Sequence, residues 1–263
     1  MTIFQALILG ALQGLTEFIP VSSSGHLVLA QSFMGLPHSS AFDALVNLGT
    51  FLALLVYFHK RIWGVLLKIF RDKDIRLARN LLISAIPVGV AGFLLADFFE
   101  GSLIQNPTVV VIMIVLVGIL MIVLDKLPRL SSVEILDKLP TKRAWIIGLA
   151  QVISLVPGTS RSASTMIAGR LMGMTYRQAA EYSFLLSIPV MAAVITKSML
   201  LDSESIAFIN SNFGAWIASN IAAFICGLFA VSFMLRFLAK GNFKIFGYYR
   251  IGLAAVIVIF FYL

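Results

Sequence analysis

The sequence is poor in charge. Asp, Glu, Lys and Arg make up 12% of the 263 residues, and 60% are hydrophobic, whereas a soluble domain carries roughly twice that share of charged residues. This scarcity excludes an ordinary soluble enzyme and predicts an integral membrane protein with several spans. Linkers and low-complexity stretches are also missing, so a single integral membrane domain over residues 1–263 is expected.

Cysteine is almost absent. The only one is Cys226, in an apolar stretch, so it has no partner for an intrachain disulfide. The cysteine and the three histidines lack the spacing of a zinc site. The N-terminus has no basic segment of the kind that begins a cleavable signal peptide, so none is expected.

Lys and Arg outnumber Asp and Glu by 20 to 12 and gather between the apolar segments. The basic loops at 60–79, 125–143 and 236–244 are expected on the cytoplasmic side, near anionic lipid. The first of them has the pattern of an amphipathic helix at the membrane surface. The loops at 97–106 and 201–212 have acidic residues and no Lys or Arg, which predicts the outer side. Nucleic-acid binding is not expected.

Six apolar segments are long enough to span a membrane, each close to the ~20 residues that a bilayer requires. They cover approximately 42–58, 80–97, 108–125, 180–200, 213–235 and 245–263. The expected fold class is therefore an all-α polytopic membrane protein with six transmembrane helices. The alternation of basic and acidic loops agrees with this order.

Two further segments begin as apolar helices, at about 3–18 and 144–155, and are then broken by Pro20 and Pro157. Broken backbone inside a membrane is tolerated only where protein or water satisfies it. Both segments are expected to be re-entrant helix–loop–helix hairpins that enter and leave on one side. The alternative is that each crosses the membrane as two short helices.

The two broken segments read as copies of one unit. A shift of 138 residues, without a gap, places Gly10, Gln13, Ser22 and Ser24 on Gly148, Gln151, Ser160 and Ser162. The repeats cover about 1–125 and 144–263. Each half has three expected spans, an odd number, so the repeat is expected to have inverted topology. The two loops are then expected to meet near the midplane.

Glu17 lies deep in the first apolar segment, where a carboxylate is costly and indicates function. The alternative is that it hydrogen-bonds to loop amides. Gln13 lies one helical turn earlier and shares its face. Because Gln13 is neutral, it can position water or a metal-bound ligand but cannot act as a general base.

The first loop contains Ser22, Ser23, Ser24, Gly25 and His26. Serine hydroxyls commonly cap the next helix. A histidine near a hydroxyl is also the minimal arrangement for activating a nucleophile. His26 can alternatively be the nucleophile itself or a proton donor to a leaving oxygen.

The second loop, PGTSRSAST at 157–165, has the composition of an anion site before a helix. Arg161 supplies a planar fork suited to phosphate, and Ser160, Ser162 and Thr165 add donors. The alternative is a structural ion pair between Arg161 and Glu17, which also brings the two loops together. Arg250, in the last span, either extends to the cytoplasmic edge or points inward as a second phosphate ligand.

The motifs QGLTEFIPVSSSGH and PGTSRSAST resemble the two signatures of undecaprenyl-diphosphate phosphatases of the bacitracin-resistance (BacA) type. The resemblance covers the whole chain. It implies a multi-pass protein of the bacterial cytoplasmic (inner) membrane that hydrolyses a polyprenyl diphosphate lipid, regenerates the carrier for peptidoglycan and other wall polymers, and confers bacitracin resistance. It also implies six spans, two re-entrant hairpins, inverted repeats and often a homodimer, with membrane lipid around them.

The same resemblance assigns roles to individual residues. The motif positions fall on Gln13, Glu17, Ser22, Ser23, His26, Ser160, Arg161 and Thr165, with Arg250 beside them. Catalytic roles are expected for Glu17, Ser23, His26 and Arg161. Ser23 is the expected nucleophile, with Glu17 or His26 as base. Attack by water and a nucleophilic His26 stay open.

A divalent cation, Mg²⁺ or Ca²⁺, is expected, with Glu17 as its ligand. Many members of the family have glutamate where this chain has Gln13, so a site that needs both carboxylates would be weaker here. The rival function is a lipid-phosphate transporter or flippase, since transporters also use inverted repeats with broken helices. The cluster of Glu17, serines and His26 favours an enzyme, because anion binding alone does not need it.

Overall fold

The computed structural model describes residues 1–95, 106–126 and 135–262, and every element of secondary structure in these ranges is helical. The elements are α1 Ile3–Phe18, α2 Ser23–Phe33, α3 Ser40–Leu45, α4 Asn47–Tyr57, α5 His59–Arg71, α6 Arg76–Leu94, α8 Pro107–Leu124, η2 Leu136–Lys138, α9 Thr141–Val152, η3 Ile153–Leu155, α10 Arg161–Leu171, α11 Tyr176–Leu200, α12 Ser203–Ser211, α13 Phe213–Leu238 and α14 Lys244–Tyr262. The expected all-α class is confirmed.

Five of the described helical segments are long and apolar enough to cross a membrane, so the chain is a multi-pass membrane protein. They are Ser40–Tyr57, Arg76–Leu94, Tyr176–Leu200, Phe213–Leu238 and Lys244–Phe261, and each overlaps an expected span. The expected span at 108–125 corresponds to a shorter apolar helix, Thr108–Leu124. Residues 97–105 of the expected outer loop and 127–134 of the second basic loop lie outside the described residues.

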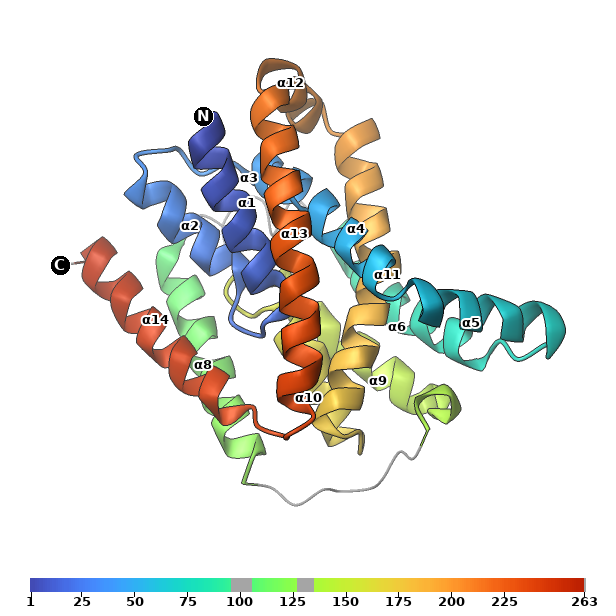
Figure 1. Ribbon diagram of the computed structural model, residues 1–263. Helices are drawn as coiled ribbons and strands as arrows, with labels where there is room; N and C mark the ends of the chain where they lie inside the picture. The colour runs from blue at the N-terminus through green and yellow to red at the C-terminus, as the bar shows by residue number, and fades with distance from the viewer. Residues whose placement is uncertain (96–105, 127–134, 263) are drawn as a thin grey trace.

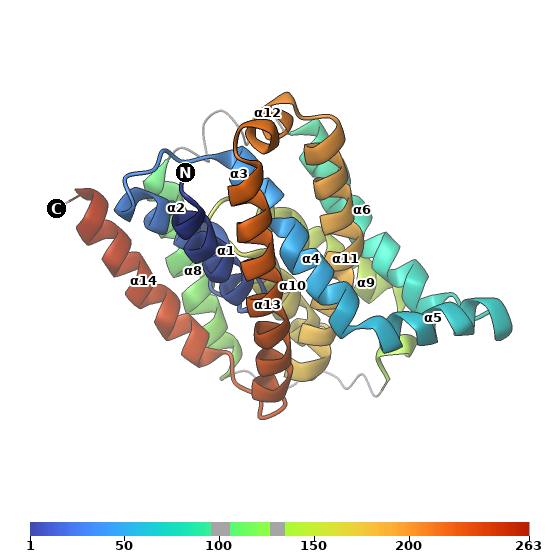
Figure 2. The same cartoon turned by 45° about the horizontal axis from the view of Figure 1, so that its top comes forward.

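The two broken segments form helix–loop–helix units, and their first helices pack against different helices of the bundle. Helix α1 packs along α13, α9 packs along α6, and α8 runs beside α14 (Figures 1 and 2). A Cβ on Gly10 would lie 2.0 Å from the Ser219 carbonyl oxygen, and a Cβ on Gly148 would lie 2.6 Å from that of Ser84. Small residues let membrane helices approach closely, so these two repeat-related glycines seat α1 and α9.

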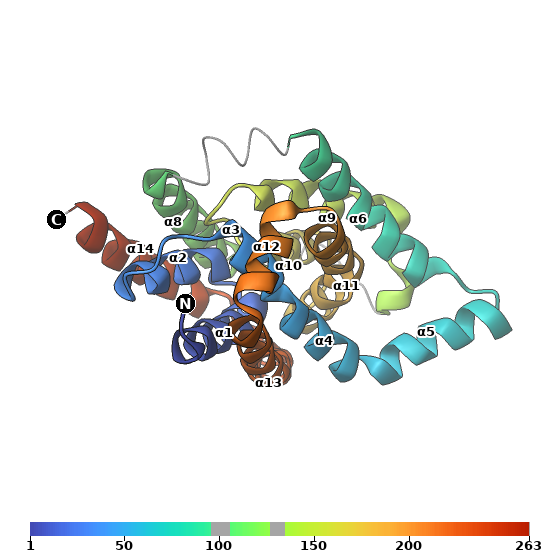
Figure 3. The ribbon, with the colours of Figure 1, turned by 90° about the horizontal axis from the view of Figure 1, so that it is seen from above.

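Helix α5 projects from the bundle at the side opposite α14 (Figure 3). It has no buried residues, as expected for a surface helix. Arg61 forms ion pairs with Asp137 in η2 and with Glu181 on α11, and Lys68 also reaches Asp137. Burial opposes ionisation of Asp137, but the hydrogen bonds from Arg61 and Lys68 outweigh it and lower the pKa of its carboxyl. The charged contacts therefore tie α5 to η2 and α11.

The connection between α2 and α3 contains a pH-dependent contact. The His38 Nε2 lies 3.3 Å from Asp43 Oδ2, and the hydrogen bond to Asp43 raises the pKa of the imidazole above 6.5 despite partial burial. Folding therefore stabilises the protonated ring. This contribution is fully present below pH 6.5 and is lost as pH rises through the folded pKa.

We expect His38→Gln to lower the melting temperature in detergent at pH 5.5 and to have a decreasing effect as the pH approaches 8.5. The loss is below about 1 kcal/mol, because the pair is partly exposed. His59→Gln is the matched control, since the His59 ring bonds the Val56 carbonyl rather than a carboxylate. A difference between wild type and His38→Gln that does not change with pH would contradict the assignment.

Candidate active site

The first loop turns sharply after Pro20 and presents Ser23 at the start of α2. Ser22 has a left-handed backbone (φ 73°), and its hydroxyl caps α2 by accepting a hydrogen bond from the Gly25 N–H at 3.3 Å. The capping expected for this loop is confirmed for Ser22. Ser22 therefore serves the turn, and the Ser23 hydroxyl is free to serve another group.

The second loop has the same construction 138 residues later. Ser160 has φ 75° and caps α10 by accepting from the Ala163 N–H at 3.3 Å. Gly158, with φ 85°, lies against α8, where a Cβ would be 2.4 Å from the Val110 carbonyl oxygen. Only glycine fits that approach. Arg161 thereby becomes the first residue of α10 and faces the first loop.

The two loops meet at the carboxylate of Glu17. Its Oε2 accepts a hydrogen bond from the Ser23 hydroxyl at 2.7 Å and one from Gln13 Nε2 at 3.0 Å. Its Oε1 accepts from Arg161 Nη2. The side chains of Arg161 and Glu17 are only 18% and 11% exposed, so water screens the pair weakly. The expected contact between the loops and the shared face of Gln13 and Glu17 are both confirmed.

This geometry suits activation of a hydroxyl. Ser23 donates its proton to a carboxylate, which is the arrangement of a nucleophile with its general base. Arg161 adds a cation beside them, where an anionic substrate requires one. A nucleophile, a base and an anion-binding group are thus brought together from α1, α2 and α10.

His26 does not contact the Ser23 hydroxyl. Its Nδ1 lies 2.7 Å from the Ser22 carbonyl oxygen, and its Nε2 lies 2.7 Å from the Tyr249 hydroxyl. Since a carbonyl oxygen only accepts, Nδ1 carries a proton. In the neutral form of the ring, Nε2 then accepts from the Tyr249 hydroxyl. Of the two expected bases for Ser23, only Glu17 is within hydrogen-bond distance.

Arg250 is fully buried, so of its two expected placements the one that points inward is confirmed and the one at the membrane edge is wrong. Its guanidinium donates to five backbone carbonyls of the two loops and α8: Pro20, Met113, Ile114, Gly158 and Thr159, at 2.7–3.3 Å. Carbonyls left free where a helix is broken need donors inside a membrane. Arg250 therefore ties both loops to α8, and a direct phosphate contact stays a prediction.

The remaining expected phosphate donors are engaged within the fold. The Thr165 hydroxyl bonds the Arg161 carbonyl at 2.9 Å and lies 2.6 Å from the Ser183 hydroxyl on α11. The Ser162 hydroxyl lies 3.1 Å from that of Ser160. Roles for Ser22, Ser160, Ser162 and Thr165 in phosphate binding stay predictions.

Two residues of the site were not expected from the sequence. Asn47 Oδ1 accepts from Gln13 Nε2 at 3.1 Å, and its Nδ2 donates to the Asp43 carbonyl at 2.7 Å. The sequence feature that could have indicated Asn47 is a polar amide side chain inside an apolar segment. Tyr249, which bonds His26, had no signal beyond its place beside Arg250.

The donor set for a metal is small. Within the described ranges, no group of three His, Cys, Asp or Glu side chains is placed to hold a metal ion. The Gln13 Oε1 is buried without a hydrogen-bond partner and lies on the side chain that bonds Glu17. One carboxylate and one amide oxygen fit a hard cation that takes further oxygen ligands from a phosphate substrate.

Comparisons with known proteins place the chain among related sequences over nearly its whole length. The family described as bacitracin resistance protein BacA matches residues 6–256. The undecaprenyl-diphosphatase of Aquifex aeolicus is 37% identical over 99% of both chains. That of Marinobacter nauticus is 38% identical over 98% of both, and undecaprenyl-diphosphatase 1 of Mesorhizobium japonicum is 35% identical over 98% of both.

Proposed function

The chain belongs to the bacitracin resistance protein BacA family, and we propose that it hydrolyses undecaprenyl diphosphate to undecaprenyl phosphate and inorganic phosphate. The relatives named undecaprenyl-diphosphatase support this activity. The observation that carries it is the convergence of Ser23, Glu17 and Arg161. The reaction returns the lipid carrier to the synthesis of peptidoglycan and other wall polymers in the bacterial cytoplasmic membrane. Because bacitracin sequesters the diphosphate, the activity confers resistance.

We propose that the chain is one membrane domain with six spans and two re-entrant hairpins. The five long apolar helices, with Thr108–Leu124 as the sixth, support this count. The repeat is supported by α2 and α10, whose bounds differ by 138 residues at both ends, and its inverted topology follows from three proposed spans in each half. Positive φ recurs at the same shift, at Ser22 and Ser160 and at Gly35 and Gly173. A homodimer is part of the same proposal.

The lipid tail lies in the bilayer while the diphosphate enters between the two loops. Arg161 and the backbone N–H groups at the starts of α2 and α10 neutralise it. Charge stabilisation and positioning dominate phosphoryl transfer, because the transferred group carries its charge on several oxygens. Gln13 and Asn47 hold the Glu17 carboxylate in place through the hydrogen bonds described above.

Ser23 Oγ attacks the terminal phosphorus while its proton passes to Glu17, and the bond to the undecaprenyl phosphate oxygen breaks. Glu17 returns that proton to the departing phosphate. It then takes a proton from the water that cleaves the phosphoserine and passes it to Ser23 Oγ as inorganic phosphate leaves. His26 and Tyr249 orient the first turn of α2 through their contact.

We propose that Glu17 and Gln13 Oε1 hold Mg²⁺ or Ca²⁺ together with the substrate. When bound, the ion supplies positive charge to the phosphate oxygens. The rival function, a lipid-phosphate transporter or flippase, is favoured by the paired broken helices. The hydrogen bond from Ser23 to Glu17 favours hydrolysis, since carrying a phosphate needs no nucleophile.

The test is phosphate release from undecaprenyl diphosphate by the purified protein in detergent. We expect release by wild type and by the control Glu204→Ala, an exposed glutamate on α12. Glu17→Ala should reduce it by at least about 10³-fold, because base and positioning are lost together. EDTA is expected to stop the reaction. No release by a folded, monodisperse wild type across metals and pH would favour the transporter.

A further inference from the structure

A second basic site lies at the far end of α10, away from Glu17 and Arg161. A hollow of about 430 Å³ opens where α10 ends, α11 begins and α13 turns into α14. Arg170 lines it, nine residues after Arg161, which corresponds to about 13 Å along the helix. The hollow is therefore separate from the site of hydrolysis.

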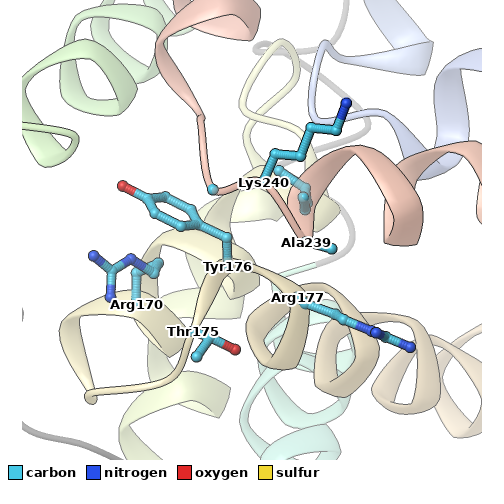
Figure 4. Close-up of a pocket in the computed structure, with 8 residues that line it drawn as sticks. Arg170, Thr175, Tyr176, Arg177, Ala239 and Lys240 are labelled. Atoms are coloured by element: carbon cyan, nitrogen blue, oxygen red, sulfur yellow. The ribbon is translucent and has the colours of Figure 1, made fainter.

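All the charged side chains that line this hollow are positive. Arg170, Arg177 and Lys240 line it, and no carboxylate does so among its described lining residues. Figure 4 shows Arg170 on α10, Arg177 on α11 and Lys240 in the turn after α13, with their charged ends pointing in different directions at the rim of the hollow. Asp125 does not line the hollow. Its carboxylate accepts hydrogen bonds from the Tyr176 hydroxyl and from the backbone N–H groups of Phe243 and Lys244.

Arg170 is held rigidly and keeps an unused donor. Its Nη1 donates to the Met174 carbonyl at 2.9 Å, and its guanidinium carbon lies 4.2 Å from the centre of the Tyr176 ring. Its Nε is buried and has no acceptor among the described residues. A buried donor without a partner is costly unless a ligand or water accepts its hydrogen bond. The helix α11, which begins at Tyr176, adds the positive end of its dipole.

Arg177 and Lys240 are exposed and form no ion pair among the described residues. Uncompensated cations at the end of membrane helices attract the anionic headgroups of the cytoplasmic leaflet. The apolar part of the lining, at Leu238 and Ala239, continues into α13, whose Phe233 is exposed. An amphiphile therefore matches the hollow better than a free ion does.

We propose that this hollow binds the phosphate group of an anionic phospholipid beside Arg170, with Arg177 and Lys240 adding positive charge at its rim and the acyl chains along α13. The site is independent of the phosphatase reaction, because none of these three residues contacts Glu17, Ser23 or Arg161. A bound lipid would brace the turns that connect α10 with α11 and α13 with α14.

The test is native mass spectrometry of the full-length protein with added phosphatidylglycerol or phosphatidylcholine. Wild type is expected to retain one phosphatidylglycerol in preference to phosphatidylcholine. Arg177→Gln with Lys240→Gln should weaken that retention about tenfold, since each basic residue near the surface contributes roughly 1 kcal/mol, part of which is screened. Lys60→Gln with Lys142→Gln removes two exposed charges from α5 and α9 and should leave retention unchanged.

Equal retention by wild type and the Arg177/Lys240 variant would overturn the proposal, as would an equal loss in the control pair. Millimolar inorganic phosphate is the second probe. No displacement of the lipid is the expected result, because the acyl chains contribute to binding. Full displacement would assign the hollow to a soluble phosphate compound and overturn the lipid assignment. Phosphate release in detergent should be the same for all three proteins.

Discussion

Replacing Arg161 by alanine is expected to reduce phosphate release by about 10³-fold or more. The arginine supplies the only cationic side chain that contacts Glu17 among the described residues, at the point where the two loops meet. An arginine that stabilises the charge of a transferred phosphoryl group contributes roughly 10³–10⁵-fold to turnover. The measurement is steady-state hydrolysis of undecaprenyl diphosphate in detergent, with kcat and KM determined separately.

The control must separate lost chemistry from lost folding. Removing Arg161 leaves the Glu17 carboxylate without its ion-pair partner, and such a loss costs about 3–5 kcal/mol for a fully buried pair. The cost is smaller here, because both side chains reach solvent in part. Arg161→Lys keeps the positive charge but loses the planar guanidinium that can donate two parallel hydrogen bonds to phosphate, so we expect intermediate activity. Near-normal turnover by a monodisperse Arg161→Ala protein would contradict the proposed site.

Replacing Ser23 by alanine is expected to lower kcat by at least about 10³-fold with a small change in KM. The hydroxyl that donates to Glu17 is removed, whereas Arg161 and the loop amides still bind the diphosphate. Ser24→Ala is the matched control. Ser24 is the next residue of the same turn, it is exposed, and its hydroxyl contacts that of Ser22 rather than Glu17.

A covalent intermediate gives an independent readout for Ser23. Rapid acid quenching of wild type during turnover, followed by peptide mass spectrometry, should find a phosphoryl group on the peptide that contains Ser23. Full activity of Ser23→Ala would assign the attack to water or to His26 instead. A phosphoryl group on His26 would identify the histidine as nucleophile.

The local construction of the site could be read from the sequence. A proline near the break and serines at the same places in the two broken segments predicted two turns that each start a helix. The caps at Ser22 and Ser160 follow from short-range backbone chemistry. The alternative of an ion pair between Glu17 and Arg161 was also available, because opposite charges in a membrane seek each other. These features depend on neighbours in the chain or on charge alone.

The orientation of His26 could not be read in the same way. Its partner Tyr249 lies 223 residues away, and nothing in the sequence distinguishes Tyr249 from Tyr248 as that partner. The two possibilities for Arg250 differed only in where its side chain pointed, which depends on how α14 packs against α8 and the loops. The same limit applies to Asn47, the first residue of α4, whose contact with Gln13 on α1 joins residues 34 positions apart.

The position of Arg250 has a consequence for how the protein is made. The ribosome synthesises the chain from its N-terminus, so both loops are made well before residue 250 of the 263. Until α14 arrives, the carbonyls of Pro20 and Gly158 lack the donor that joins them. We therefore expect a chain that stops before residue 250 to keep Glu17, Ser23 and Arg161 but to lack the contacts that join its two loops to α8.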